Sequence, residues 1–161
     1  MTAEPVAIED SIESDRPVLL ELFGQAVRAS YPDLARMTRS EARDRIEAQW
    51  AWYREQGGHV RVTRAPGGGV SACCWSLPTH HPVTGVREWF IVILAVDPGH
   101  RRQGLGRLLL DDARNEARKV GIHRLRLFTH TANVAAHSLY REAGFEEATV
   151  ELVLDGEESR G

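Results

Sequence analysis

One stretch of the sequence, Asp97–Leu110, combines glycine and basic residues at a spacing that suits an anion. An apolar run ends just before it and a helical pattern begins within it, so we expect a helix that starts at the end of a buried strand. The first amides of a helix lack partners within the helix, and the helix dipole adds positive potential there. Gly104 and Gly106 keep side chains away from those amides, so a pyrophosphate can approach them. Basic side chains surround this position, namely His100, Arg101, Arg102 and Arg107.

Two common nucleotide-binding motifs do not fit this stretch. Gly99 and Gly104 have the glycine spacing of a phosphate-binding loop, but Leu105 and Gly106 stand where that loop needs Lys and Ser or Thr. ATP hydrolysis is therefore not supported. A dinucleotide fingerprint fails as well, because its third glycine is replaced by Leu109 and the strand lies late in the chain.

The strand that precedes this stretch is apolar at every position from Trp89 to Val96. Such a strand must be covered on both faces, so it belongs at the centre of a sheet with helices on each side. Asp97–Gly99 ends the strand, and the helix that follows ends at Gly121.

The remaining periodicity predicts further elements in the order β-α-α-β-β-β-α-β-α-β, which describes one α/β domain. Loops are expected at Ala29–Met37 and Pro78–Arg87. Before the central strand we expect a strand at Val6–Ile8, a helix capped by Ser14 or Asp15, a helix opened by the capping pair Thr38 and Glu41, and a hairpin of His59–Arg64 and Val70–Leu77. After the helix that follows the central strand we expect a strand around Leu125 and Leu127, a short helix capped by Asn133, and a last strand from Phe145 to about Leu154.

Length, charge and cysteine content exclude several classes of protein. A chain of 161 residues has the usual size of one domain, and its formal charge of -3 argues against a general nucleic-acid binder. Cys73 and Cys74 are adjacent, so no disulfide framework exists. The first residues do not resemble a signal peptide, and the longest apolar run is far shorter than the roughly 20 residues of a membrane span. We therefore expect a cytoplasmic protein that binds neither nucleic acid nor membrane.

Two motifs together resemble those of the GNAT superfamily of acyl-CoA-dependent N-acyltransferases. The first is similar to the coenzyme A signature of that family, and the second is similar to its downstream Asn, Tyr and Gly-Phe pattern. The two motifs are Val96-Asp97-Pro98 with Arg101-x-x-Gly104-x-Gly106, and Asn133 with Tyr140 and Gly144-Phe145. The resemblance covers Trp89 to about Leu154 by motif and the amino-terminal half by topology alone.

The resemblance implies an α/β (α+β) fold over residues 1–154, followed by a charged, frayed tail at 155–161. It implies a central mixed sheet of about six or seven strands flanked by about four helices, with central strands splayed to admit coenzyme A. Acetyl-CoA is the implied co-substrate and an amine the implied acceptor, with no metal.

The resemblance also implies roles for individual residues. The amides of Arg102–Gly106 would take the pyrophosphate, and the backbone of Leu94–Val96 would pair with the pantetheine like an added strand. The N–H of Leu94 or Ala95 is the candidate oxyanion donor, and Tyr140 occupies the family's position for the proton donor to the departing thiolate. The expected cofactor-binding residues are Leu94, Ala95, Val96, Arg101, Arg102, Gln103, Gly104, Leu105, Gly106, Arg107, Asn133 and Tyr140.

The general base does not follow from the resemblance. Many relatives carry an acidic residue a few positions before the closing valine of the strand, where this sequence has Val92 and Ile93. Glu88 is the nearest acid and the catalytic candidate. Three histidines are further candidates for relaying a proton through water, namely His80, His81 and His130.

The preferred function is an acetyl-CoA-dependent N-acetyltransferase that acts on a primary amine by direct attack in a ternary complex. The alternative is a catalytically idle acyl-CoA-binding sensor or regulatory module, which the missing acid before Val96 keeps open. No metal site is expected, because Cys73 and Cys74 point to opposite faces of a strand and His80-His81 lacks partners at ligand spacing. The acceptor, the acyl chain preference and the choice between monomer and homodimer stay open.

Overall fold

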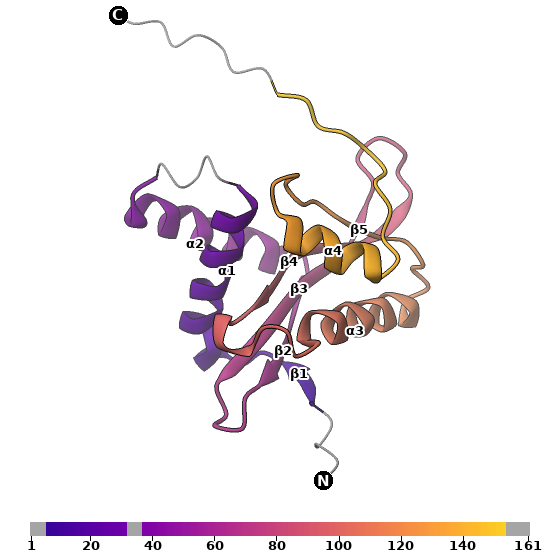
Figure 1. Cartoon of the computed structure of the whole chain (residues 1–161). Helices are drawn as coiled ribbons and strands as arrows, with labels where there is room; N and C mark the ends of the chain where they lie inside the picture. The colour runs from indigo at the N-terminus through magenta and orange to yellow at the C-terminus, as the bar shows by residue number, and fades with distance from the viewer. Residues whose placement is uncertain (1–5, 32–36, 154–161) are drawn as a thin grey trace, which may run out of the picture.

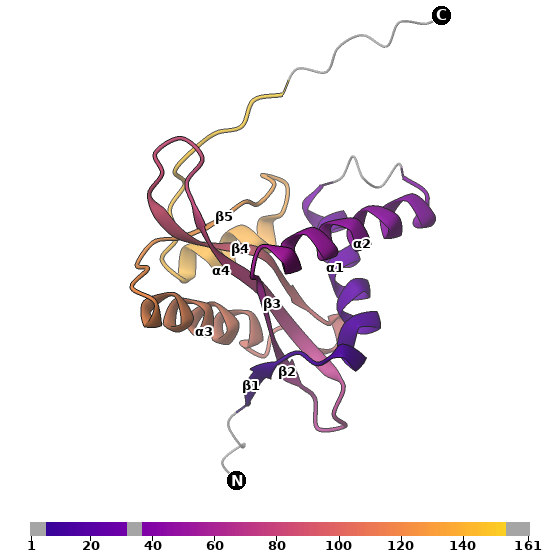
Figure 2. The same cartoon turned by 180° about the vertical axis from the view of Figure 1, so that it is seen from behind.

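A computed structural model describes residues 6–31 and 37–153 (Figure 1). Five strands form one sheet in the order β1-β2-β3-β4-β5, with α1 and α2 on one face and α3 and α4 on the other (Figures 1 and 2). The strands are β1 (Ile8–Asp10), β2 (His59–Arg64), β3 (Val70–His80), β4 (Arg87–Val96) and β5 (Leu125–Leu127). The helices are α1 (Arg16–Ser30), α2 (Arg39–Glu55), α3 (Leu105–Lys119) and α4 (Val134–Glu142), with short 3-10 turns at Glu13–Asp15 and Pro98–His100.

The sheet is mixed, and its last pairing is short. Strands β1 to β4 pair antiparallel, whereas β5 runs parallel to β4. β5 pairs only with Trp89–Ile91, so the rest of β4, from Val92 to Val96, has β3 as its one neighbour among the described strands. The predicted central position of this strand and the splay beside it are confirmed.

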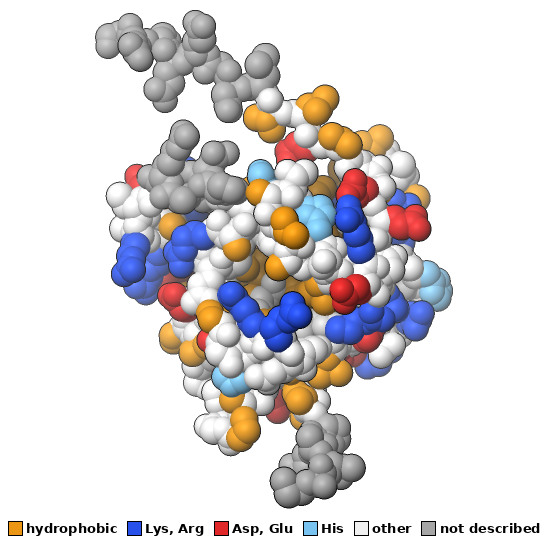
Figure 3. All heavy atoms as spheres, viewed as in Figure 1, with side chains coloured by type: hydrophobic (Ala, Val, Ile, Leu, Met, Phe, Trp, Pro, Cys, Tyr) orange, Lys and Arg blue, Asp and Glu red, His pale blue; other side chains and the backbone are white. Residues whose placement is uncertain are grey.

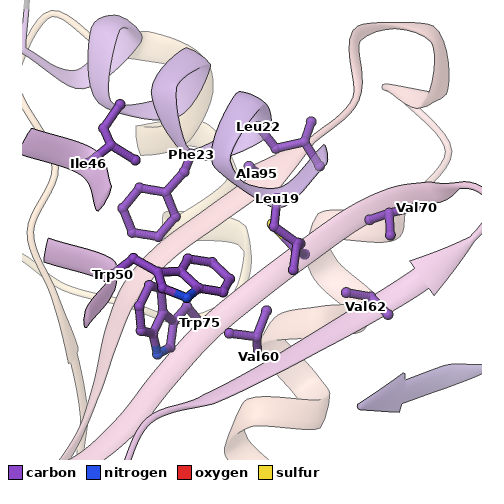
Figure 4. Close-up of a cluster of buried hydrophobic side chains, with 11 residues drawn as sticks. Leu19, Leu22, Phe23, Ile46, Trp50, Val60, Val62, Val70, Trp75 and Ala95 are labelled. Atoms are coloured by element: carbon purple, nitrogen blue, oxygen red, sulfur yellow. The ribbon is translucent and has the colours of Figure 1, made fainter. Parts of the chain in front are cut away.

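Aromatic side chains fill the core between the sheet and α1 and α2 (Figure 4). Trp75 of β3 packs edge-on against Phe23 and Trp50, with ring centroids 5.2 and 4.6 Å away. On the opposite face, Leu105 and Leu109 of α3 are buried against the sheet. The apolar stripes predicted for the helices therefore face the sheet from both sides.

The predicted start of α2 is confirmed. Thr38 N donates to Glu41 Oε2 at 2.9 Å, and Glu41 N donates to Thr38 Oγ1 at 3.3 Å, which is a complete capping box. Helix α1 begins directly after Asp15 and has Pro17 in its first turn, as predicted, but the predicted side-chain cap is wrong. The Asp15 carboxylate instead accepts from Ile12 N at 2.9 Å.

The last predicted strand is wrong over the described residues, so the sheet has one strand fewer than the expected order. Residues 145–153 form no strand, and Leu154 and the expected tail lie outside the described part. Ala148, Val150 and Leu152 do alternate with polar residues there, but a strand also needs a neighbouring edge to which its backbone can bond.

Two predicted boundaries also need correction. The loop expected at Pro78–Arg87 is only 81–86, because β3 continues through His80. The pairing of β2 with β3 ends at Ser76, so β2 does not extend alongside Pro78. The missing N–H of Pro78 therefore costs no hydrogen bond to β2. The first strand is Ile8–Asp10, two residues later than expected.

Candidate active site

The turn between β4 and α3 presents unpaired amides at the start of a long helix. Arg102 has a φ of 64° and is the one non-glycine residue with positive φ in the described chain; Gly104, the N-cap of α3, has a φ of 78°. This curled backbone groups successive N–H groups, an arrangement that binds anions. No side chain caps the first turn of α3, so its amides are open to a ligand.

The two glycines of this turn serve different purposes. Gly104 is required by its left-handed backbone, and a Cβ there would meet no atom within 4 Å. Gly106 is favoured by packing, because a Cβ there would lie 3.0 Å from Leu139 Cδ2 of α4, so that this side chain would have to shift. That both glycines make room for a phosphate stays a prediction; at Gly106 the absence of a side chain also lets α3 approach α4.

Asp97 and His100 hold the turn in shape. Asp97 Oδ2 accepts from Gly99 N at 3.1 Å and lies 2.8 Å from His100 Nδ1. The sequence interpretation took His100 as a donor around the anion and missed this pairing, whose signal is the i, i+3 spacing of the two residues. One ring nitrogen of His100 is thus already committed to the turn.

The arginines around the turn are engaged to different degrees. Arg107 donates to Glu142 O at 2.7 Å and so ties α3 to the end of α4. Arg101 reaches back to Val96 O at 3.3 Å, and Arg102 is exposed. Figure 3 shows basic side chains beside a central hollow with an apolar floor on this face of the molecule.

Beside the turn, β4 has backbone groups that point away from β3. Asp97 N donates to Ser71 O of β3 at 2.9 Å. Because N–H groups alternate in direction along a strand, the N–H of Ala95 also points toward β3, and those of Leu94 and Val96 point to the open side. Leu94 is therefore the better placed of the two candidate oxyanion donors.

An irregularity at Val92 sets this direction. Trp89 N donates to Arg124 O beside β5 at 2.8 Å, so odd-numbered N–H groups face β5 at the start of β4. Ile91 pairs with Ser76 and Ile93 with Trp75, which leaves Val92 as the extra residue of a bulge. Bulges redirect a strand in this way and are frequent beside active sites. No sequence signal marked this one.

Tyr140 and Asn133 come from α4 and the residue before it. Tyr140 is half-buried against the cluster that Leu94 and Val96 also contact. Burial raises the pKa of Tyr140 to about 12, so its hydroxyl is a hydrogen-bond donor at neutral pH. Asn133 Oδ1 accepts from Ala136 N at 3.2 Å, which caps α4 as predicted.

The amide of Asn133 has a further contact that links two distant segments. Its Nδ2 donates to Ser30 Oγ at 3.3 Å and so joins the start of α4 to the end of α1. In this structure the side chain of Asn133 therefore fixes helices rather than reaching into the open side of β4.

Glu88 lies at the opposite end of β4 from Leu94 and is fully buried. Six residues of extended strand separate it from Leu94 by about 20 Å. Its Oε1 accepts from Arg126 Nε at 2.5 Å, and Arg124 Nε lies 3.7 Å from Oε2. The Arg126 guanidinium lies over the rings of two phenylalanines, Phe90 at 4.9 Å and Phe128 at 5.0 Å. This arrangement favours a structural role for Glu88 over the predicted catalytic one.

Neither of two candidate histidines offers a free basic nitrogen. His81 Nδ1 accepts from Val83 N and Thr84 N, both at 3.2 Å, and His130 Nδ1 accepts from Ala132 N at 3.1 Å. A neutral ring held in this way carries its proton on the other nitrogen, which then only donates. His80 is exposed at the end of β3.

The two cysteines are buried on opposite faces of β3, as predicted. Burial raises the pKa of the Cys73 thiol to about 12, so it stays protonated and unreactive. Within residues 6–31 and 37–153, no group of three or more His, Cys, Asp or Glu side chains is placed to hold a metal ion. No helix of that part of the chain is long and apolar enough to cross a bilayer.

Comparison with known proteins agrees with this geometry. Mycothiol acetyltransferase of Sanguibacter keddieii is 29% identical over 156 residues, which cover 94% of this chain and 48% of that protein. Ribosomal protein bS18-alanine N-acetyltransferase of Escherichia coli is 47% identical over 57 residues, or 35% of this chain and 38% of that protein. The chain thus spans less than half the length of these two curated relatives.

The fold is shared with a predicted acetyltransferase of Clostridium acetobutylicum whose crystal structure was determined with acetyl-CoA. The TM-score is 0.71 at 15% identity, over 94% of this chain and 96% of that chain. The sequence model of the acetyltransferase (GNAT) family matches residues 24–145, which is most of the chain. This protein therefore belongs to the acetyltransferase (GNAT) family.

Proposed function

We propose that this protein is an N-acetyltransferase that moves an acetyl group from acetyl-CoA to a primary amine of a small molecule or peptide within a ternary complex. One observation carries the proposal: the uncapped amides of the α3 turn lie beside a stretch of β4 that has no neighbouring strand on its open side among the described strands. The first feature suits a pyrophosphate and the second suits the amide-containing pantetheine arm that follows it in coenzyme A. A cytoplasmic location, as expected from the sequence, fits this substrate.

The amides of Arg102–Gly106 would bind the pyrophosphate. Their direction is set by the left-handed backbone at Arg102 and Gly104, and the dipole of α3 adds to their positive potential. Arg101 and Arg102 would add charge from the rim. Gln103 and Leu105 would contribute backbone only, because the Leu105 side chain is buried in the core.

The N–H and C=O groups on the open side of β4 would pair with the pantetheine. The N–H groups of Val96 and Leu94 both point to the open side of β4. Val96 would bond the part of the pantetheine nearer the pyrophosphate, and the N–H of Leu94 would bond the thioester oxygen. Negative charge develops on that oxygen when the amine attacks the carbonyl carbon. A fixed backbone donor stabilises this charge without reorganising in the transition state.

Collapse of the tetrahedral intermediate would break the C–S bond while the new C–N bond is kept. The products are the amide and coenzyme A; the nitrogen loses one proton to water, and the departing thiolate takes one proton from water. A thiol has a pKa of about 8.5, so a Tyr140 hydroxyl with a pKa of about 12 gives up its proton less readily than the thiol does. Tyr140 would therefore act mainly by donating a hydrogen bond that holds and stabilises the sulfur.

The attacking amine must arrive neutral. Glu88 and two of the three candidate histidines are already engaged, so in this account the amine loses its proton to water rather than to a carboxylate of the site. The rate with saturating acetyl-CoA should then rise with pH as the acceptor's own ammonium group titrates.

A screen of amines tests the proposal. Purified protein is incubated with acetyl-CoA and a panel of amino acids, polyamines, amino sugars and short peptides, and release of free coenzyme A is followed. Two classes of acceptor, small molecules and protein amino termini, are represented because the names of the two curated relatives cover both. Acetylated product with at least one amine supports a transferase.

The second candidate function is an acyl-CoA-binding sensor without catalysis. The observation that favours it is that none of the sequence candidates supplies an available carboxylate base beside Leu94. Tight acetyl-CoA binding with no turnover on any amine would favour the sensor. Failure to bind acetyl-CoA would contradict both functions.

A further inference from the structure

Two arginines of α3 bind the carboxy-terminal end of α4. Arg107 Nη1 donates to Glu142 O at 2.7 Å, and Arg114 Nη2 donates to Ala143 O at 2.8 Å. The last carbonyl groups of a helix have no partner within the helix, and cations stabilise them because the helix dipole is negative at this end. Here the cations come from a neighbouring helix, so they also fix where α4 ends relative to α3.

One carboxylate orients both guanidinium groups. Asp111 Oδ2 accepts from Arg107 Nε at 3.1 Å, and Asp111 Oδ1 lies 3.6 Å from Arg114 Nη1. The three residues are spaced i, i+4 and i+7, which places them on one face of α3. Partly exposed ion pairs of this kind add little stability. The row is therefore better explained by the two donors that it aims at α4.

The same turn of α4 is also fixed by its own backbone and by packing. Phe145 N donates to Tyr140 O at 2.9 Å, which closes the end of the helix. The close approach of Gly106 to Leu139 places the two helices in contact one residue before Arg107. Helices α3 and α4 lie side by side on one face of the sheet in both views (Figures 1 and 2).

Tyr140 belongs to the turn that the arginines hold, two positions before Glu142. Its ring packs edge-on against that of Phe145, with centroids 5.8 Å apart, and it shares a buried cluster with Leu94 of β4. A hydrogen bond weakens steeply when its donor is displaced or turned. The position of the end of α4 therefore decides whether the Tyr140 hydroxyl can reach a sulfur atom beside Leu94.

Helix α3 would contact both ends of this part of the cofactor. Gly104 is its N-cap, at the turn assigned above to the pyrophosphate, and Arg107 follows three residues later. The first turn of α3 would thus bind the pyrophosphate while the following turns hold the helix that carries Tyr140.

We propose that Arg107 and Arg114 are positioning residues for Tyr140. They hold the end of α4 at the distance from the α3 turn at which the Tyr140 hydroxyl meets the sulfur of a cofactor bound at that turn. This inference rests on the function proposed above and on the role of Tyr140 in it. It gives Arg107 a role through α4, in place of the direct contact with the cofactor that the family resemblance implies.

A double-mutant cycle on kcat tests the proposal, with the full chain, acetyl-CoA and an amine found by the screen. Replacing both arginines, Arg107→Met with Arg114→Met, should lower kcat by about fivefold with little change in the KM for acetyl-CoA. In a Tyr140→Phe background the same pair should cost almost nothing, because the hydrogen bond that it positions is already absent. Arg118→Met is the matched control, since Arg118 is an exposed arginine in the last turn of α3.

Amide hydrogen exchange gives a second readout that needs no turnover. The amide of Phe145 should exchange about tenfold faster in the pair variant than in the wild type, because the end of α4 is released. Arg118→Met should leave this rate unchanged. If the pair variant does not fold, Arg107→Met alone keeps the bond from Arg114 and carries the same test, with an expected loss in kcat of about twofold.

Each of the following results would overturn the proposal. An unchanged exchange rate at Phe145 would mean that the arginines do not hold the end of α4. A raised KM for acetyl-CoA at unchanged kcat would mean direct contact with the cofactor, and an equal loss of kcat in the Tyr140→Phe background would mean that another group is positioned. A wild type that acetylates no amine contradicts the proposed function and this inference together, whereas an active wild type matched by the pair variant contradicts this inference alone.

Discussion

The two ends of strand β4 are stabilised in opposite ways. At its start, Glu88 is a fully buried carboxylate held by Arg126, and the backbone is paired on both sides. At its end, Leu94–Val96 carry no charged side chain, and their backbone lacks a neighbouring strand on one side in the described part of the chain. The end of β4 that carries charge has a strand on both sides (the closed end), and the end without charge has a strand on one side only (the open end). At this second end, the polar groups that a ligand can reach are therefore peptide groups.

This contrast explains why Glu88 is more conspicuous in the sequence than the open end of β4. A carboxylate in a strand attracts attention in a sequence, yet here one of its oxygens accepts from Arg126 and the other lies 3.7 Å from Arg124. The unpaired N–H groups at the other end belong to leucine and valine, which give no sign of chemistry by residue type. The candidate site therefore lies where the pairing of β5 with β4 ends, after Ile91.

Removal of one N–H should have the largest effect on catalysis. Leu94→Pro deletes the donor on the open side while keeping the bonds to β3, so kcat should fall by about 100-fold to 1000-fold. Kinetics with saturating acetyl-CoA measure this. Ala95→Pro is the comparison, since that N–H points to β3 and its loss should prevent folding as seen by circular dichroism. Full activity in a folded Leu94→Pro variant would remove Leu94 from the mechanism.

The turn at α3 should be nearly as sensitive. Gly104→Val forces a branched residue into a left-handed backbone, so affinity for acetyl-CoA should drop by at least about 100-fold in calorimetric titration. Gly121→Val is a matched control, because Gly121 has a φ of 74° and equally open surroundings at the other end of α3. It should lose similar stability and keep its affinity; equal loss of affinity in both variants would point to general unfolding.

At the closed end, disruption should affect stability rather than binding. Arg126→Met leaves Glu88 buried with only a distant arginine, which should cost about 3 kcal/mol of unfolding free energy, measured by urea denaturation. Adding Glu88→Gln removes the charge as well and should recover part of that loss. If Arg126→Met instead lowers kcat at unchanged stability, the closed end takes part in catalysis and the contrast fails.

Tyr140→Phe should have the smallest of these effects. A lost hydrogen bond to the departing sulfur lowers kcat by about tenfold with little change in the KM for acetyl-CoA. Tyr53→Phe is a control on α2, away from the α3 face. Because the raised pKa keeps Tyr140 protonated up to about 12, the wild-type rate should not fall between about pH 7 and about pH 10. A decline in that range, absent in Tyr140→Phe, would contradict the assignment.

Local signals predicted much of the fold. The capping pair Thr38 and Glu41, the strand formed by the apolar run Trp89–Val96 and the start of α3 at Gly104 each depend on a few neighbouring residues, and each was confirmed. Features that depend on pairing between distant segments were not predicted. The bulge at Val92 follows from the register with β3, and the failure of residues 145–153 to form a strand follows from the lack of a paired edge.

The same distinction applies to the candidate site. The α3 turn was found because its glycines and arginines lie within a few residues of each other. The partners of Glu88, by contrast, come from β5 and the residue before it, 36 and 38 positions later in the chain, and no local pattern announces them.

Amide hydrogen exchange measured by NMR with and without coenzyme A tests the central claim most directly. The account predicts that the ligand protects the amides of the turn from Arg102 to Gly106 together with those of Leu94 and Val96, and leaves Ala95 as slow as before. Binding that protects a different set of amides, or no protection at saturating ligand, would contradict it.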